Sequence, residues 1–425
     1  MWKRKVSIKE QYGSLKHFLK GDEDCHYIGQ RYIEGTNIFA RREWRGVKDT
    51  SYAFYRWLVT WVKMGGLVAR DPVRIVKAFF RYRWLSAYLI APAMIDRWIE
   101  GDRGMALRCD LTAADCMISD SVETLWNSLR ADRKLGETEW TEKTVAFDYT
   151  LPKHLIFGFP GTYAINMQQH AAFMLPLIRK ELGSYYVDQS VSCGIPGDMC
   201  TLPLVETGVA VVGEYPDIGN FWMTTNNPCD ANMMDNNAMY RELSANGKKA
   251  VHPLTTPLMY DDPTTKELGV HELYEAIEFM ERQFGRPFDW EAFREHLRAT
   301  NKVNREELER WDIYARTDNG CLNPVLQGLF RIYFYQQGGT KYFAKTSPKL
   351  LKMFYECVEQ DIKPFPKTRH RALAWSCGST YYIQGVSWLY NCWGILCVIN
   401  MDSLTGHNII DTEDEEIMME DLADW

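Results

Sequence analysis

Two cysteines, Cys200 and Cys229, stand where a loop or strand is expected to run into a helix, in GDMCTLPL and TNNPCDAN. The first turn of a helix has backbone N–H groups without intrahelical partners and carries the positive end of the helix dipole. A thiolate is stabilised there, so its pKa falls, and the thiolate is the form that binds iron. The two positions therefore indicate a metal or cluster site.

The ordinary alternative for any one cysteine is burial as a small apolar residue. The chain has 11 cysteines, an odd number, and a cytosolic location would keep them reduced, so a disulfide framework is not expected. The sequence has no Cys-x-x-Cys pair, which argues against a zinc ribbon and a thioredoxin-type site.

Acid–base candidates near the two cysteines are few. Asp198, Asp230 and His252 fall at expected loop or strand ends. Asp230 stands beside a helix start, where it is more simply explained as a residue that stabilises the helix dipole. His252 precedes a proline and is more simply explained as a hydrogen-bonded loop histidine. No catalytic residue is assigned.

The elements that would position the cysteines alternate in type. Strands are expected at 154–160, 185–191, 209–216 and 221–227, helices at 166–182, 201–208 and 228–246, and AVHPLTTP closes the series. This alternation predicts an α/β fold with a doubly wound parallel sheet. Strand-to-helix turns meet at the carboxyl edge of such a sheet, where distant cysteines can come together.

Four regions follow from these patterns. Residues 1–148 form a helical N-terminal region, 150–265 the first α/β domain with the cluster, 271–365 a helical domain, and 366–425 the start of a second, incomplete α/β domain. Basic residues on the aromatic helices of 41–103 have three interpretations: a solvated face, a docking face for a subunit, or a landing site for a CoA phosphate.

The whole-chain properties limit the partners and the location. A net charge of -7 argues against nucleic acid. No stretch reaches the roughly 18 apolar residues that span a bilayer. The first residues, MWKRKVSIKEQYGS, lack the apolar core of a secretion signal. We therefore expect a cytoplasmic protein without membrane contact, and we expect the acidic end, DTEDEEIMMEDLADW, to be a solvated helix or tail.

The runs at 188–257, 272–305 and 369–401 together resemble subunits of the 2-hydroxyacyl-CoA dehydratase and benzoyl-CoA reductase family. The resemblance covers roughly residues 150 to 405. In that family one cysteine opens a helix after a loop and a second follows a strand about 30 residues later, which corresponds here to Cys200 and Cys229.

The resemblance implies a heterodimer of related subunits with a 4Fe-4S cluster, supplied with one electron by a separate ATP-dependent iron–sulfur activator. The electron passes to the thioester carbonyl of an acyl-CoA, and the outcome is either dehydration of a 2-hydroxyacyl-CoA to a 2-enoyl-CoA or reduction of an aromatic ring. The sequence does not separate these outcomes.

This chain departs from the family at two places. Residues 1–148 have no counterpart in the resemblance, and the family's third cluster cysteine falls in a segment after residue 425. Three explanations stay open: a truncated sequence, substitution by Cys193, or a subunit without a cluster. The last would be a non-catalytic structural partner. A cluster-free protein with thiol chemistry is a further alternative.

Overall fold

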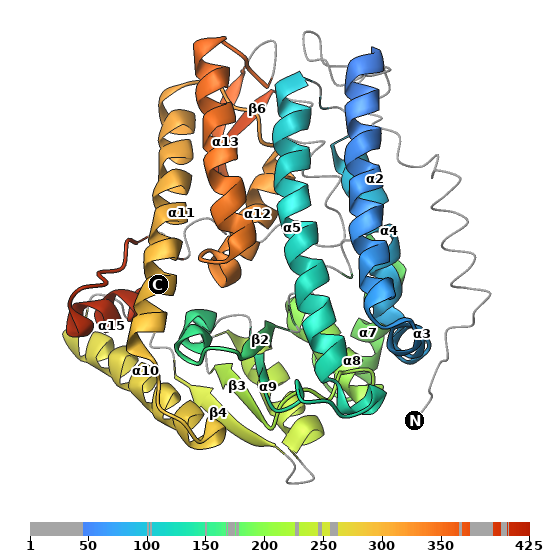
Figure 1. The fold of residues 1–425 in the computed structure, drawn as a ribbon, viewed down its shortest axis with the longest axis vertical. Coiled ribbons are helices and arrows are strands. Elements are labelled where there is room, and N and C mark those ends of the chain that lie inside the picture. Colours follow the sequence, from blue (N-terminus) through green and yellow to red (C-terminus); the bar gives the residue numbers. More distant parts are fainter. Residues whose placement is uncertain are drawn as a thin grey trace.

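A computed structural model gives the fold (Figure 1) and describes residues 46–99, 102, 104–148, 151–166, 168, 175, 178–225, 229–244, 249–255, 262–364, 368–374, 394–400, 406 and 408–425. The described residues form many helices and two parallel sheets, so the predicted α/β class with a helical N-terminal region is confirmed.

The N-terminal region is built from helices. These are α2 (Gly46–Arg70), α3 (Pro72–Arg81), α4 (Ser86–Trp98) and α5 (Gly104–Ala131), with short 3-10 turns η4 (Arg83–Leu85) and η5 (Arg133–Leu135). The Asp71 carboxylate accepts from the Arg74 N–H at 2.9 Å, and Pro72 fits the first helical position, so α3 has a well-defined start. The long helix α5 stands beside α2 and contacts it (Figure 1).

The main sheet contains β1 (Thr144–Phe147), β2 (Tyr163–Asn166), β3 (Phe221–Thr225) and β4 (Ala250–Leu254) in the order β2-β1-β3-β4, with every neighbouring pair parallel. Strands β1 and β3 are wholly buried, as expected for strands covered on both faces. Strand β1 lies in the stretch assigned to the helical N-terminal region, yet it occupies a central place in this sheet.

Three expected strands are wrong. Residues 154–160 fall mainly in a 3-10 helix, η6 (Lys153–Gly158), and residues 185–191 lie in α7 (Lys180–Ser192). The run at 209–216 continues α8 (Thr201–Val211) and then turns. Short apolar runs do not distinguish a buried strand from a buried helix. The helix expected at 166–182 is wrong at both ends, because Asn166 belongs to β2 and the helix that contains Leu182 continues to Ser192.

The predicted helical stretch after residue 271 is confirmed. It contains α10 (Pro263–Phe284), α11 (Trp290–Arg316), α12 (Pro324–Gln337) and α13 (Lys341–Glu359), and α9 (Asp230–Ser244) precedes it. Side chains of Asp262, Asp289 and Asn323 cap the starts of α10, α11 and α12.

A second, two-stranded sheet pairs β5 (His370–Ala374) with β6 (Ile395–Asn400) in parallel, in the region predicted to begin another α/β unit. The acidic end forms α15 (Glu415–Ala423), which packs on α10. Met418, Met419 and Leu422 are buried there, so this helix is less solvated than expected. Among the described residues, no helix combines the length and apolar character needed to cross a membrane.

Candidate functional site

Cys200 is the N-cap residue of α8, and a loop leads into it, both as predicted. Its side chain makes no capping hydrogen bond at the start of the helix. Burial by surrounding atoms raises the pKa of the Cys200 thiol above its ordinary value, the Cys229 thiol adds to the rise, and the Leu202 N–H opposes it. The expected fall in pKa is therefore wrong for the free thiol, because desolvation outweighs the helix-start position.

Cys229 directly precedes α9, and its carbonyl accepts from the Met233 N–H at 2.9 Å, which begins the helix. The side chain is half-buried. Cys229 therefore has the predicted place at a helix start.

Packing of α8 between α7 and α9 brings the two helix starts to the same part of the molecule. The Thr207 hydroxyl donates to the Asp235 carboxylate and ties the middle of α8 to α9. Because the Cys229 thiol influences the pKa of Cys200, the two sulfur atoms lie within electrostatic reach of each other.

The cysteines differ in their surroundings. Cys193, Cys200 and Cys229 reach the surface fully or in part, whereas the other five cysteines in the described part of the chain are buried. Cys321 lies near Cys109 and Cys357 in the core, where all three are buried and have a packing role. Cys193 ends α7 and is exposed. Cys25, Cys377 and Cys392 lie outside the described residues.

The two thiols fit an iron–sulfur cluster in three respects: accessibility, a place at helix starts, and mutual proximity. Across the described ranges, no group of three or more His, Cys, Asp and Glu is arranged to hold a metal ion. Cys200 and Cys229 thus form a pair without a described third ligand, and their role as cluster ligands stays a prediction.

A cluster of buried carboxyl groups lies behind the cysteines and was missed from the sequence. It consists of Asp148, just after β1, Glu206 on α8 and Asp235 on α9. The Tyr215 hydroxyl donates to Glu206 at 3.1 Å, and the Asn232 amide donates to Asp148 at 3.4 Å. Acidic residues inside the apolar run LVETGVAVV and after NMM were the available signal.

Burial is the main cause that raises the pKa values of Glu206 and Asp235, and neighbouring carboxylates add to it. For Asp235 the pKa rises to about 7. Like charges that share a buried site cannot all ionise, so this cluster retains protons at neutral pH. The arrangement can therefore store protons on the two helices that begin at the cysteines, between one and two helical turns along each.

Asp235→Asn is expected to change the pH dependence of stability. An unfolded Asp has a pKa of about 3.9, so folded protein binds a proton that the unfolded chain releases. The stability from this proton is complete below about pH 4 and is lost as the pH rises to about 7. The asparagine in the variant has no proton to lose. The free energy of unfolding of the variant, relative to that of wild type, should therefore grow by about 1.4 kcal/mol per pH unit up to neutrality.

Urea unfolding of both proteins between pH 5 and pH 8 measures this difference. Asp230→Asn, which removes an exposed carboxylate from the start of the same helix, is the matched control. Parallel stability curves for Asp235→Asn and wild type would show that the buried carboxyl does not bind its proton in this way.

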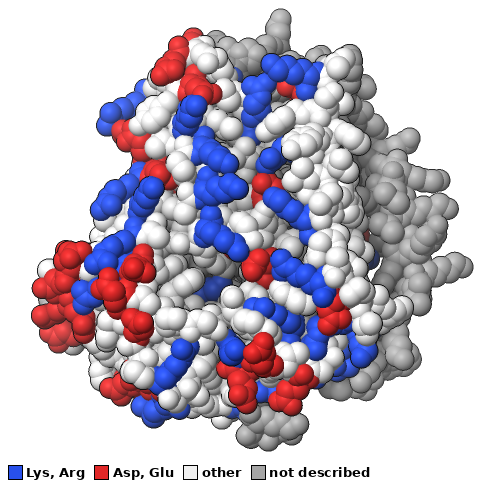
Figure 2. Space-filling model, in the orientation of Figure 1, with Lys and Arg blue, Asp and Glu red and all other residues white. Residues whose placement is uncertain are grey.

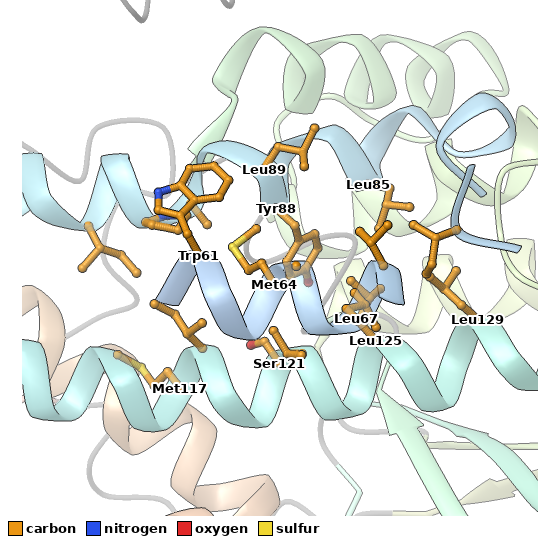
Figure 3. Close-up of a pocket in the computed structure, with 18 of the residues that line it drawn as sticks. Trp61, Met64, Leu67, Leu85, Tyr88, Leu89, Met117, Ser121, Leu125 and Leu129 are labelled. Carbon is orange, nitrogen blue, oxygen red and sulfur yellow. The ribbon is translucent and has the colours of Figure 1, made fainter. Parts of the chain in front are cut away.

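An apolar cavity of about 200 Å³ lies among α2, α4 and α5, on another side of the molecule (Figure 3). Trp61, Met64 and Leu89 form one part of its wall, and Met117 and Leu125 another. A hydrogen bond of 3.0 Å joins the Ser121 and Tyr333 hydroxyl groups at its wall. The cavity offers hydrophobic volume but few polar groups that could orient a ligand.

Comparison with protein families settles the relationship of the chain. The family described as 2-hydroxyglutaryl-CoA dehydratase, D-component, matches residues 169–425, more than half of the sequence. The chain belongs to this family. The prediction of family membership is thereby confirmed, and the matched range contains both Cys200 and Cys229.

Much of the described N-terminal part lies before the matched range of the dehydratase D-component family. Helices α2 to α5 and strands β1 and β2 precede residue 169, yet β1 pairs directly with β3 inside it. The family segment of this chain therefore shares one sheet with residues outside it. No curated protein matches the chain.

Proposed function

We propose that this chain is a subunit of an oxygen-sensitive iron–sulfur enzyme that passes one electron to an acyl-CoA thioester. Membership of the D-component family implies a subunit of a 2-hydroxyacyl-CoA dehydratase-type complex. The reaction is dehydration of a 2-hydroxyacyl-CoA to a 2-enoyl-CoA, or reduction of a benzoyl-CoA-type ring. The observation that carries the proposal is the pair Cys200 and Cys229 at neighbouring helix starts within the matched range.

In this proposal Cys200 and Cys229 hold a 4Fe-4S cluster, which when bound supplies a low-potential electron. The chain's own contribution is electrostatic. Both cysteines stand at helix starts, where the positive end of the helix dipole favours negative charge. The protonated carboxyl groups of Glu206 and Asp235 lie behind them and keep the buried side of the site close to neutral.

The partners proposed are a related second subunit, an ATP-dependent iron–sulfur activator protein and the acyl-CoA substrate. An electron donor strong enough to reduce a thioester carbonyl needs an energy source, which the activator would provide. Cytoplasmic location remains part of this proposal.

A second candidate is a non-catalytic structural partner subunit without a complete cluster. The observation that favours it is the two-cysteine site, because the described residues give no third ligand. The retention of two accessible cysteines at helix starts favours the enzyme.

The test is purification of the full chain under strict exclusion of oxygen, alone and together with its related subunit, followed by iron and acid-labile sulfide analysis. We expect a brown protein with stoichiometric iron and sulfide that bleaches in air. If iron and sulfide stay at background in both anoxic preparations, the enzyme proposal is rejected and the structural-partner function replaces it.

A further inference from the structure

A polar cavity of about 520 Å³ lies away from the cysteines, between the N-terminal helices and the segment matched by the family. Its walls come from α5, η6, the start of β2, α11 and the connection from α12 to α13. Figure 2 shows this face hollowed near its middle, with basic side chains in and around the hollow. A volume of this order is typical of small-molecule sites, for which roughly 300–1,000 Å³ is usual.

Two residues of opposite charge at the cavity wall are almost completely buried. Lys153 on η6 is 4% exposed and Asp120 on α5 is 3% exposed. Asp120 Oδ2 is buried without a hydrogen-bond partner in the described part of the chain, and the charges of Asp120 and Lys153 influence each other. A buried carboxyl oxygen without a hydrogen bond is costly, so this wall offers an unsatisfied group to a ligand, and the Lys153 ammonium gives the same wall a positive charge.

Neutral polar groups at the same wall also lack partners. Asn127 Oδ1 and Thr340 Oγ1 are buried atoms without a hydrogen bond in the described structure. His296, another wall residue, bonds His154 at 2.8 Å, and burial lowers its pKa, so the ring is neutral. A ligand with one charged group and further hydrogen-bonding groups would satisfy these atoms.

Glu123 and Lys341 at the rim pair with each other, and Glu295 adds an exposed carboxylate there. Glu123 lies 3.8 Å from both Arg70 and Lys341 and accepts from the Tyr342 hydroxyl at 3.1 Å. Inside the cavity, burial raises the pKa of Asp120 and lowers that of Lys153, while each moderates the shift of the other. A protonated Asp120 leaves the Lys153 ammonium as the group that an incoming anion would meet.

We propose that this cavity binds a small mono-anionic carboxylate, whose carboxylate pairs with Lys153 and whose other polar groups bond Asn127 and Thr340. A single ammonium balances one negative charge, whereas a phosphate dianion would keep an unpaired charge in a buried space. Lys153 likewise disfavours a cation. The site goes beyond the proposed function, since none of its lining residues belongs to α8 or α9.

The proposal gives the N-terminal region a role in ligand binding. Asp120 and Asn127 lie on α5 and Lys153 on η6, all before residue 169, while Thr340 lies within the matched range. The cavity is therefore completed by residues from both sides of this boundary.

Calorimetric titration of the full chain at pH 6.5 tests the site with acetate, lactate and 4-hydroxybenzoate as carboxylates. The neutral 4-hydroxybenzamide and the dianionic phenyl phosphate are the comparison ligands. We expect one-to-one binding of at least one carboxylate and none of the amide. Lys153→Met should weaken that binding at least about tenfold through loss of a charge-assisted hydrogen bond. Asp120→Asn should bind as well as wild type or better.

Lys349→Met, which removes an exposed ammonium from α13, is the matched control and should bind like wild type. If Lys153→Met does not fold, protection of Lys153 from acetylation by bound carboxylate, read by mass spectrometry on the unmutated protein, replaces it. If none of the carboxylates shows saturable binding at concentrations up to roughly 10 mM, the proposal is overturned. Unchanged binding in folded Lys153→Met, absence of protection, or tighter binding of phenyl phosphate would also overturn it. Because no step uses iron, these results are independent of the cluster.

Discussion

Cys200→Ser and Cys229→Ser are each expected to lower the iron content of anaerobically purified protein to near background and to abolish turnover by the complex. A serine hydroxyl is a far weaker iron ligand than a thiolate, and each position supplies one of the two cysteine ligands of the proposed cluster. Both side chains lie at helix starts near the surface, where serine is an acceptable N-cap residue. Far-UV circular dichroism should therefore match that of wild type.

Cys193→Ser is the matched control for these variants. Cys193 is exposed, ends α7 and lies seven positions before Cys200. Iron that stays high in Cys193→Ser and falls in the other two assigns the metal to Cys200 and Cys229. Iron that falls in all three assigns Cys193 as a further ligand. Wild-type iron in both Cys200→Ser and Cys229→Ser would remove these residues from any cluster site.

Gly208→Ala is expected to cause a large loss of stability. Gly208 lies in α8 where the helix touches the backbone of α7, and an added Cβ would come 2.1 Å from the Tyr186 carbonyl oxygen. A backbone atom cannot rotate away, so α8 would have to move. Overpacking of this kind costs about 3 kcal/mol or more of the free energy of unfolding. Because α8 begins at Cys200, the same shift should lower iron content.

Gly66→Ala is the matched control for the change from glycine to alanine inside a helix. No heavy atom lies within 4 Å of a Cβ built at Gly66 in α2, and glycine is a poor helix former. This variant should gain about 0.4–1 kcal/mol. Urea unfolding followed by tryptophan fluorescence compares both variants with wild type. Equal stability of Gly208→Ala and wild type would contradict the close approach of α7 and α8.

The sequence predicted the fold best where periodicity was long and the ends were marked. Helices α10 to α13 have repeated apolar spacing, and proline or a capping side chain marks most of their starts. Prediction failed for α7 and for the end of α8, which continues past residue 208 to Val211. The run TLPLVETGVAVV is apolar on all sides because α8 is buried between two helices, so it carries no helical stripe.

The positions of Cys200 and Cys229 at helix starts could be predicted because loop residues and helix formers meet there. The buried carboxyl cluster could not be predicted, since Asp148, Glu206 and Asp235 come from three separate elements that only the tertiary fold brings together. The same is true of Lys153 on η6 and Asp120 on α5, which lie far apart in the sequence and interact electrostatically only in the folded chain. The spacing of residues along the sequence does not reveal contacts between segments that are far apart in the chain.

The apolar cavity among α2, α4 and α5 also affects how the protein responds to hydrostatic pressure. The side chains that line its 200 Å³ are mostly hydrocarbon and aromatic, and they offer water few hydrogen-bonding partners. Unfolding eliminates such poorly hydrated space, so the unfolded chain takes up less volume than the folded one. High pressure should therefore destabilise the N-terminal helices more than the parts of the molecule that are packed without such a space.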